Sequence, residues 1–204
     1  TSLQVLAQAL FDGDLNVRQA ASQSLSEVKN AASAQILAPY LKHTDTFALS
    51  AILRALKPLR PQQLFEEISA LVHHEDVLVR REAVSALSWL QQDQAITILA
   101  KIAETDVDDE VRRIATGGLA YSQNISVEVI QALQHSLTSE SWQLRVEAAF
   151  TIGKLRIVQL EAPLIHAVSD LYWQVRIAAV RSLGLLKSHL AVAHLTDNFK
   201  HEIS

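Results

Sequence analysis

Two His-Glu pairs are the residues of this sequence best suited to metal chemistry. They are His74-Glu75 and His201-Glu202, which stand far apart in the sequence. An imidazole beside a carboxylate offers nitrogen and oxygen ligands, so two such pairs could hold a metal ion if the fold brought them together. The elements that carry the pairs decide whether they meet.

No other motif in the sequence points to catalysis. The chain of 204 residues contains no cysteine, which excludes disulfides, cysteine nucleophiles and thiolate-bound metals. Gly117-Gly118 is the single glycine doublet, and it falls within an expected helix rather than in a phosphate-binding loop. We therefore predict no catalytic residue and no cofactor.

The composition favours a helical globular chain. Apolar residues make up 49 % and charged residues 20 %, which excludes a disordered chain. The few glycines and prolines, 5 and 4, disfavour a turn-rich β fold. A net charge of −4 creates no basic field for nucleic acid or anionic lipid, and no apolar run is long enough to span a membrane. We expect a cytoplasmic protein that binds neither nucleic acid nor membrane.

One pattern recurs along the chain: an apolar residue, then Arg, then small or apolar residues at helical spacing. The first residue of the pattern, which we call the marker, occurs six times at a nearly constant interval. The markers are Val17, Ala48, Val79, Val111, Leu144 and Val175. Six copies at nearly one period predict six structural repeats.

Each repeat has the pattern of two amphipathic helices joined by a short polar turn. In the second helix, apolar or small residues at the marker and four, eight and eleven positions later share one face. Such a pair cannot bury its apolar faces alone, so neighbouring pairs must stack. We therefore predict an all-α, right-handed α-solenoid of about six two-helix repeats, with residues 1–204 in one array. The predicted repeats are 1–29, 30–60, 61–92, 93–123, 124–156 and 157–187, followed by a partial repeat 188–204. We expect the native array to extend further.

This repeat separates the two His-Glu pairs. They stand at the same phase four repeats apart, which is roughly 40 Å at about 10 Å per helix layer. Metal ligands lie only about 2 Å from their ion. We therefore predict that the pairs share no metal and that the chain has no metal site.

Charged residues recur at fixed positions around the markers. An Asp stands three residues before the marker in four repeats, and an Arg follows the marker in five. The Asp can cap the second helix, and the Arg can reach a neighbouring Asp or a turn carbonyl. We interpret these residues as a structural ladder rather than as an anion-binding stripe. The ladder residues are Asp14, Arg18, Asp45, Asp76, Arg80, Asp108, Arg112, Arg145 and Arg176.

The recurring unit Asp-x-x-Val-Arg-x-x-Ala-x-x-Ala/Ser-Leu resembles the HEAT-like repeats first grouped around phycobilisome bilin lyases. The resemblance covers residues 1–204 and implies the α-solenoid fold. Members of that group include bilin lyase subunits, phycobilisome-degradation factors and scaffolds without chemistry.

The second helices usually line the concave side of such arrays, and their exposed positions change character along the chain. The middle of this face is basic, and its C-terminal part is apolar. That combination is typical of a partner groove with Arg and aromatic anchors. The predicted partner-binding residues are Arg54, Arg81, Arg113, Phe150, Arg181 and Trp89.

A second candidate surface is aromatic. Trp142 and Trp173 both stand two residues before a marker, and Tyr172 lies next to Trp173. They form either an aromatic platform for a partner or a hydrophobic staple over the turn between helices. The sequence leaves both interpretations open.

The predicted function is a non-enzymatic scaffold that binds a protein partner on the concave face. The family resemblance implies an alternative, a bilin lyase subunit or tetrapyrrole chaperone acting on phycobiliproteins. In that alternative Arg54, Arg81 and Arg113 would bind propionates, while Phe150 and Trp89 would contact the rings. DNA binding is a third hypothesis, and the negative net charge disfavours it.

Overall fold

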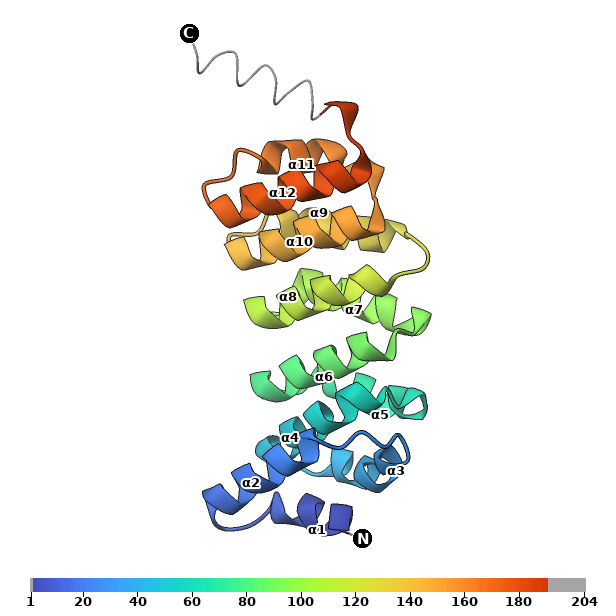
Figure 1. Ribbon diagram of the computed structural model, residues 1–204, viewed down its shortest axis with the longest axis vertical. Helices are drawn as coiled ribbons and strands as arrows, with labels where there is room; N and C mark the ends of the chain where they lie inside the picture. The colour runs from blue at the N-terminus through green and yellow to red at the C-terminus, as the bar shows by residue number, and fades with distance from the viewer. Residues whose placement is uncertain (1, 191–204) are drawn as a thin grey trace. The chain divides into compact units, whose positions relative to one another are not determined.

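The computed structural model describes residues 2–190, and all regular structure in that range is helical (Figure 1). Twelve α-helices and five short 3-10 helices follow one another there, without a β-strand. Contacts between residues group the chain into two compact units, Thr1–Ala95 and Ile96–Ser204. The boundary between them falls inside helix α7 (Asp93–Thr105).

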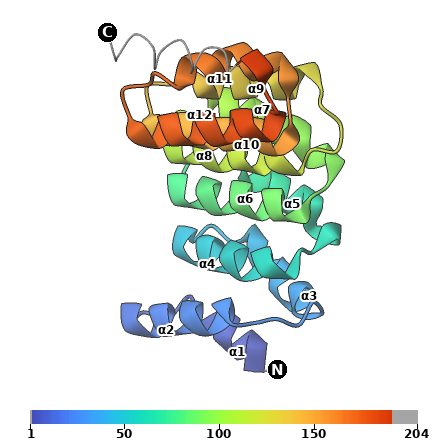
Figure 2. The same cartoon turned by 45° about the horizontal axis from the view of Figure 1, so that its top comes forward.

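The first unit contains second helices of the predicted repeats, and these pack in chain order. Helix α2 (Leu15–Ser26) packs against α4 (Thr46–Leu56), and α4 packs against α6 (Val77–Leu90), as Figure 2 shows. A shorter helical segment precedes each second helix. These segments are α1 (Ser2–Ala9), α3 (Ser33–Leu37) with η1 (Ala38–Lys42), and α5 (Phe65–Leu71), with η2 (Lys57–Leu59) and η3 (Gln62–Leu64) between α4 and α5.

The second unit repeats this arrangement. Helices α8 (Asp109–Gly118), α10 (Trp142–Leu155) and α12 (Trp173–Leu186) pack in succession, and α9 (Val127–Leu137) and α11 (Glu161–Ala167) pack against α10 and α12, respectively. The 3-10 helices η4 (Leu119–Tyr121) and η5 (Val158–Leu160) follow α8 and α10. Stacked helix pairs confirm the predicted all-α solenoid class.

Aspartates start the second helices. The side chains of Asp14, Asp45, Asp76 and Asp108 each accept a hydrogen bond from a backbone N–H in the first turn of the helix that follows. These N–H groups have no partner within the helix, and the carboxylate also favours the positive end of the helix dipole. The recurring Asp therefore fixes where each second helix begins.

A proline shortens the first helix of the second repeat. Pro39 lies within η1, directly after the five-residue helix α3. Because proline lacks an N–H and its ring clashes with the preceding turn, an α-helix does not continue through it. The first helix of the second repeat is therefore only five residues long before it continues as a 3-10 helix.

The markers form the core of the stack. Ala48, Val79, Val111, Leu144 and Val175 are all fully buried. Val17 differs, because 41 % of its surface is exposed on α2. The second helix of the first repeat therefore presents an apolar position that every later second helix buries.

The ends of four repeats share an uncommon backbone conformation. Arg60, Gln91, Arg156 and Lys187 each lie twelve residues after a marker and have φ between 47° and 55°. Gln91, Arg156 and Lys187 are the C-caps of α6, α10 and α12. This left-handed conformation stops the helix and turns the chain toward the next repeat, although it strains a residue that has a Cβ.

Candidate functional site

The ladder arginines bind the turn that precedes their own helix. Arg80, Arg145 and Arg176 each donate hydrogen bonds from Nη1 to the carbonyls five and four residues before the marker. Arg112 instead pairs with Asp109 in the first turn of α8 and donates to the hydroxyl of Ser139. The arginines therefore hold the turns between the two helices of a repeat.

Two of these arginines also form ion pairs with the adjacent repeat. Arg18 Nη2 lies 2.6 Å from Asp45 Oδ1, while the same oxygen caps α4. Arg145 binds both carboxylate oxygens of Asp170, at 2.7 and 2.9 Å. The sequence did not single out Asp170, because it stands five residues before its marker rather than three.

The Arg145–Asp170 pair is nearly buried, with side chains 13 % and 12 % exposed. Burial opposes ionisation of Asp170, but hydrogen bonds from the Arg145 guanidinium and the Tyr172 N–H outweigh it and lower the pKa of this carboxyl. The pair is therefore a charged, bidentate link between α10 and the turn before α12.

Part of the predicted aromatic platform covers this link. The rings of Trp142 and Tyr172 stack with centroids 5.7 Å apart and planes inclined by 15°. The Arg145 guanidinium lies 5.6 Å from the Tyr172 ring centroid. Trp173 joins no ring stack among the described residues and is 58 % exposed. The structure thus brings Trp142 and Tyr172 together and leaves Trp173 outside the pair.

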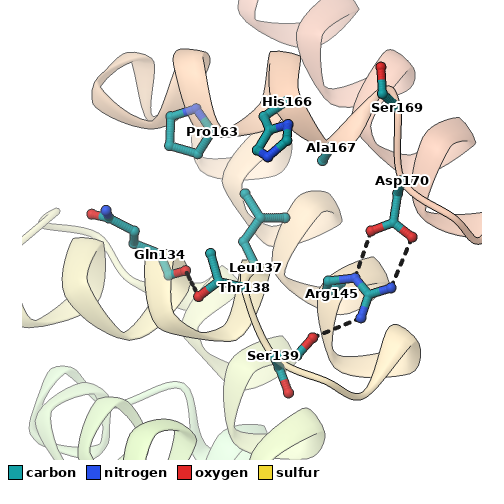
Figure 3. A pocket seen from close by; sticks show the side chains of 10 residues that line it. All are labelled: Gln134, Leu137, Thr138, Ser139, Arg145, Pro163, His166, Ala167, Ser169 and Asp170. Carbon is teal, nitrogen blue, oxygen red and sulfur yellow. Dashed lines mark hydrogen bonds and ion pairs between the residues drawn. The ribbon is translucent and has the colours of Figure 1, made fainter.

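A pocket of about 500 Å³ opens beside the same link (Figure 3). Leu137, Pro163 and His166 line one part of it, and Arg145 and Asp170 line another. In the close-up the guanidinium points to Asp170 and to the Ser139 carbonyl. The two charged groups of the pocket therefore bind each other.

Exposed and half-buried positions of the second helices, together with the end of η4, form a regular surface in the second unit. They lie two, six and ten residues after each marker, and we call them the second-helix surface. Its residues are Arg113, Gly117, Tyr121, Val146, Phe150, Lys154, Ile177, Arg181 and Leu185. Lys154 Nζ lies 4.5 Å from the Tyr121 ring centroid, which shows that residues of successive repeats meet there.

This surface is apolar and cationic. Phe150, Tyr121, Ile177 and Leu185 are 43 %, 39 %, 40 % and 49 % exposed. The exposed cations Lys154 and Arg181 form no ion pair with a carboxylate in the described part of the chain. The surface therefore combines large exposed apolar side chains with cations that pair with no described carboxylate.

Arg113, another residue predicted to bind a partner, is engaged within the chain. It pairs with Glu110 at 2.7 Å and with Glu147 at 2.6 Å. The hydrogen bond to Glu110 is the largest cause that raises the pKa of this guanidinium; burial opposes it, and the charges of both glutamates add to it. A Cβ on Gly117 would lie 2.7 Å from Glu147 Oε1, so the glycine makes room for the carboxylate.

The remaining predicted partner-binding residues lie in the first unit. Arg54 Nη2 is 2.8 Å from Glu82 Oε1, and Arg81 is half-buried. Trp89 is 39 % exposed, and the guanidinium of Arg60 lies 5.3 Å from its ring centroid. Arg54 therefore forms an ion pair with a carboxylate, whereas Trp89 is an exposed aromatic ring in contact with the Arg60 guanidinium.

Sequence reasoning missed Tyr121 and Lys154. Both stand ten residues after their markers, which is also the position of Trp89. A comparison of the repeats at this position would have found them. Their pairing depends on how adjacent helices are rotated, which the period does not specify.

The first His-Glu pair has a structural role. His74 Nδ1 accepts a hydrogen bond of 3.0 Å from the Asp76 N–H in the turn before α6. Within residues 2–190 no three His, Asp or Glu side chains gather closely enough to hold a metal ion. The second pair, His201-Glu202, lies outside the described residues.

Among residues 2–190, no helix has the length and apolar character to cross a bilayer.

A family model described as HEAT repeats matches residues 48–120 and 129–203. Among solved structures, the Escherichia coli protein YibA has a TM-score of 0.72 at 16 % identity, covering 96 % of this chain and 77 % of that one. An engineered protein has a TM-score of 0.66 at 22 % identity, covering 92 % and 99 %. A designed armadillo repeat protein, solved in complex with the peptide (KR)4, has a TM-score of 0.63 at 17 % identity, covering 91 % and 100 %. No curated protein matches. At these identities the likeness is one of fold.

Proposed function

The chain belongs to the HEAT-repeat family, and from this premise we propose that it is a non-enzymatic scaffold that binds a protein partner on its second-helix surface. Stacked helical repeats present extended surfaces of this kind to other proteins. The observation that carries the proposal is the exposed apolar and cationic group of Phe150, Tyr121, Lys154 and Arg181 in the second unit.

Phe150 is the central anchor of the proposed site. It lies in the middle of α10, between Val146 and Lys154 on the same helix face. Burying an exposed aromatic ring against a partner removes apolar surface from water, and aromatic and Arg side chains dominate the binding energy of many interfaces. Phe150 in a partner's pocket, with Arg181 beside it, fits this pattern.

The chemistry of the surface defines the partner. Lys154 and Arg181 favour carboxylates, and Phe150 and Leu185 favour apolar side chains. We therefore propose a partner segment in which acidic residues alternate with apolar ones. Electrostatic attraction of this kind raises the association rate and weakens with salt.

The tetrapyrrole alternative stays a prediction that no observed contact favours. Of Arg54, Arg81 and Arg113, which this alternative assigns to the propionates, Arg54 binds Glu82, and Arg113 binds Glu110 and Glu147. The lyase-type resemblance and the cytoplasmic location likewise stay predictions from the sequence.

The test compares partner capture by matched variants. Wild type, Phe150→Ala, Arg181→Glu and Arg156→Glu are used as baits in extracts of cells that express the protein, and the captured partner is then purified. Arg156 is the control, because it is an exposed arginine of the same unit at the end of α10. We expect Phe150→Ala and Arg181→Glu to raise the Kd at least ten-fold, about 1.4 kcal/mol. Equal binding by all four proteins would contradict the proposal.

A further inference from the structure

The pocket between the ends of α9 and α11 plays no part in the proposed scaffold function. Its volume of about 500 Å³ is in the range of small-ligand sites. In Figure 3 the α11 residues Pro163 and His166 lie above the α9 residues Leu137 and Thr138. All residues that line the pocket belong to α9, α10, α11 and the turns after α9 and α11, so its walls lie within the second unit.

Three polar side chains line the pocket without a hydrogen-bond partner among the described residues. They are the Gln134 carboxamide, the His166 imidazole and the Ser169 hydroxyl. Gln134 lies on α9, His166 lies on α11, and Ser169 stands in the turn after α11. Each of them can accept a hydrogen bond from a ligand, the imidazole in its neutral form.

Two further groups in the lining are acceptors by their existing bonds. The Thr138 hydroxyl donates its proton to carbonyls of α9, so only its lone pairs remain for a ligand. Asp170 Oδ1 accepts from Arg145 Nη2 and from the Tyr172 N–H, whereas Oδ2 accepts only from Arg145 Nε. One lone pair of Oδ2 therefore has no partner among the described residues.

The electrostatics of the pocket favour a cation. Arg145 directs four of its five N–H groups at Asp170 and at the carbonyls of Ser139 and Glu140, so its charge is balanced within the chain. No lysine and no second arginine is among the described residues of the lining. The negative, C-terminal end of the α9 dipole lies at the pocket, where Thr138 caps this helix.

We propose that this pocket binds the guanidinium group of an arginine side chain of a partner protein. A guanidinium has five N–H donors in one plane and no acceptor, which matches a set of acceptors that comes from two helices and a turn. Its donors bind Asp170 Oδ2, the Thr138 hydroxyl and the Gln134 carboxamide. The methylene groups of the arginine pack against Leu137 and Pro163. A lysine offers only three donors on a point charge and fits this spread set less well.

The preceding repeat lacks the residues that this site needs. Ten residues before the marker, where α9 has Gln134, helix α7 carries the cation Lys101. Five residues before the marker, where the sixth repeat has Asp170, the fifth repeat has Ser139. The site therefore belongs to one pair of repeats. It goes beyond the proposed scaffold function, because it uses neither second-helix anchor and recognises a cation instead of acidic residues.

A nuclear magnetic resonance titration of the ¹⁵N-labelled whole chain tests the proposal. The probe is Nα-acetyl-arginine amide, whose blocked ends resemble a protein backbone. We expect saturable shifts of the backbone amides of Thr138, Ser169 and Asp170. Nα-acetyl-citrulline amide has the same length but no charge, and we expect it to bind about ten-fold more weakly, because charge-assisted hydrogen bonds are the stronger ones.

Two variants of exposed lining residues have matched controls one repeat earlier. His166→Ala and Thr138→Val should each weaken binding of the arginine probe about three-fold or more. His135 and Thr105 stand at the same distances from their markers and do not line the pocket, and the Thr105 hydroxyl also donates to a carbonyl of its own helix. His135→Ala and Thr105→Val should therefore bind the probe as wild type does.

Four results would overturn the proposal. The first is an arginine probe that causes no saturable shift, and the second is a citrulline probe that binds equally well. The third is tighter binding of Nα-acetyl-glutamate amide, which would show an anion site, or of n-butylguanidine, which would show a site for a free guanidine. The fourth is an equal loss of binding in the variants and in their controls.

Discussion

Asp170 is the residue that most directly couples one repeat to the next in the second unit. We expect Asp170→Asn to lower the free energy of unfolding by about 2 kcal/mol at neutral pH, since it breaks a nearly buried bidentate pair. The pKa of Asp170 is lowered in the folded state, so its contribution is complete above the ordinary Asp pKa of about 3.9 and is lost as the pH falls through the lowered value. Urea unfolding at pH 7 and at about pH 3 measures both effects.

Asp109→Asn is the matched control for this variant. Asp109 also pairs with an arginine, but its side chain is 56 % exposed, so we expect a loss of less than about 1 kcal/mol. A loss for Asp170→Asn that is the same at both pH values would show that the charge of Asp170 is not what stabilises the link.

Gly153 and Gly184 both stand nine residues after their markers, and replacing each by alanine should change the free energy of unfolding in opposite directions. Gly153→Ala places a Cβ 2.8 Å from the backbone of Ser182, and we expect a loss of about 1–3 kcal/mol from overpacking. Gly184→Ala enters open space and should add about 1 kcal/mol through helix propensity. Thermal or urea unfolding of both variants measures the two changes in stability, and two changes of the same sign would contradict the prediction.

At the residue scale, many contacts could be predicted from the residue types and from their positions relative to the markers. The Asp caps and the arginines that bind turn carbonyls follow from positions near the markers, because those contacts are local in sequence. The pairs Arg54–Glu82 and Arg113–Glu147 did not follow, since they join residues 28 and 34 positions apart on adjacent helices. Which carboxylate an exposed arginine reaches depends on helix rotation and on small residues such as Gly117.

At the scale of the element, substitutions can test whether the left-handed helix ends strain the backbone. Arg156 has φ of 54° at the C-cap of α10, where glycine avoids the steric penalty of a Cβ. We expect Arg156→Gly to raise the free energy of unfolding by about 1 kcal/mol. Arg181→Gly, in the interior of α12, should lower it by a similar amount. Unfolding midpoints that fall for both variants would argue against strain at Arg156.

The helix boundaries were predictable where capping and proline decide them, as at Asp45 and Pro39. The left-handed caps were not, because long polar residues such as Arg156 and Lys187 carry no signal for positive φ. A glycine at these positions would have indicated a left-handed helix end, but none of the four positions holds a glycine.

At the scale of the whole molecule, stability should follow how many neighbours a repeat has. Helix α2 buries Ala21 and Leu25, whereas α4 buries most of its length. We expect the backbone amides of α2 to exchange with deuterium at least ten-fold faster than those of α4, because fewer buried apolar contacts hold them. Hydrogen-exchange mass spectrometry measures the protection of both helices. Equal protection of the two helices would show that the first unit opens only as a whole.

The turns that the ladder arginines hold also determine where this chain tolerates a change of length. Arg145 fixes the carbonyls of Ser139 and Glu140, so an insertion there would pull both away from the guanidinium. The segment 122–125, which is exposed from residue 123 onward, follows η4 and lies in the longest interval between markers. No described hydrogen bond from a ladder arginine holds it. A loop, tag or reporter domain therefore belongs after the second helix of a repeat, where the stack allows variation, and not between its two helices.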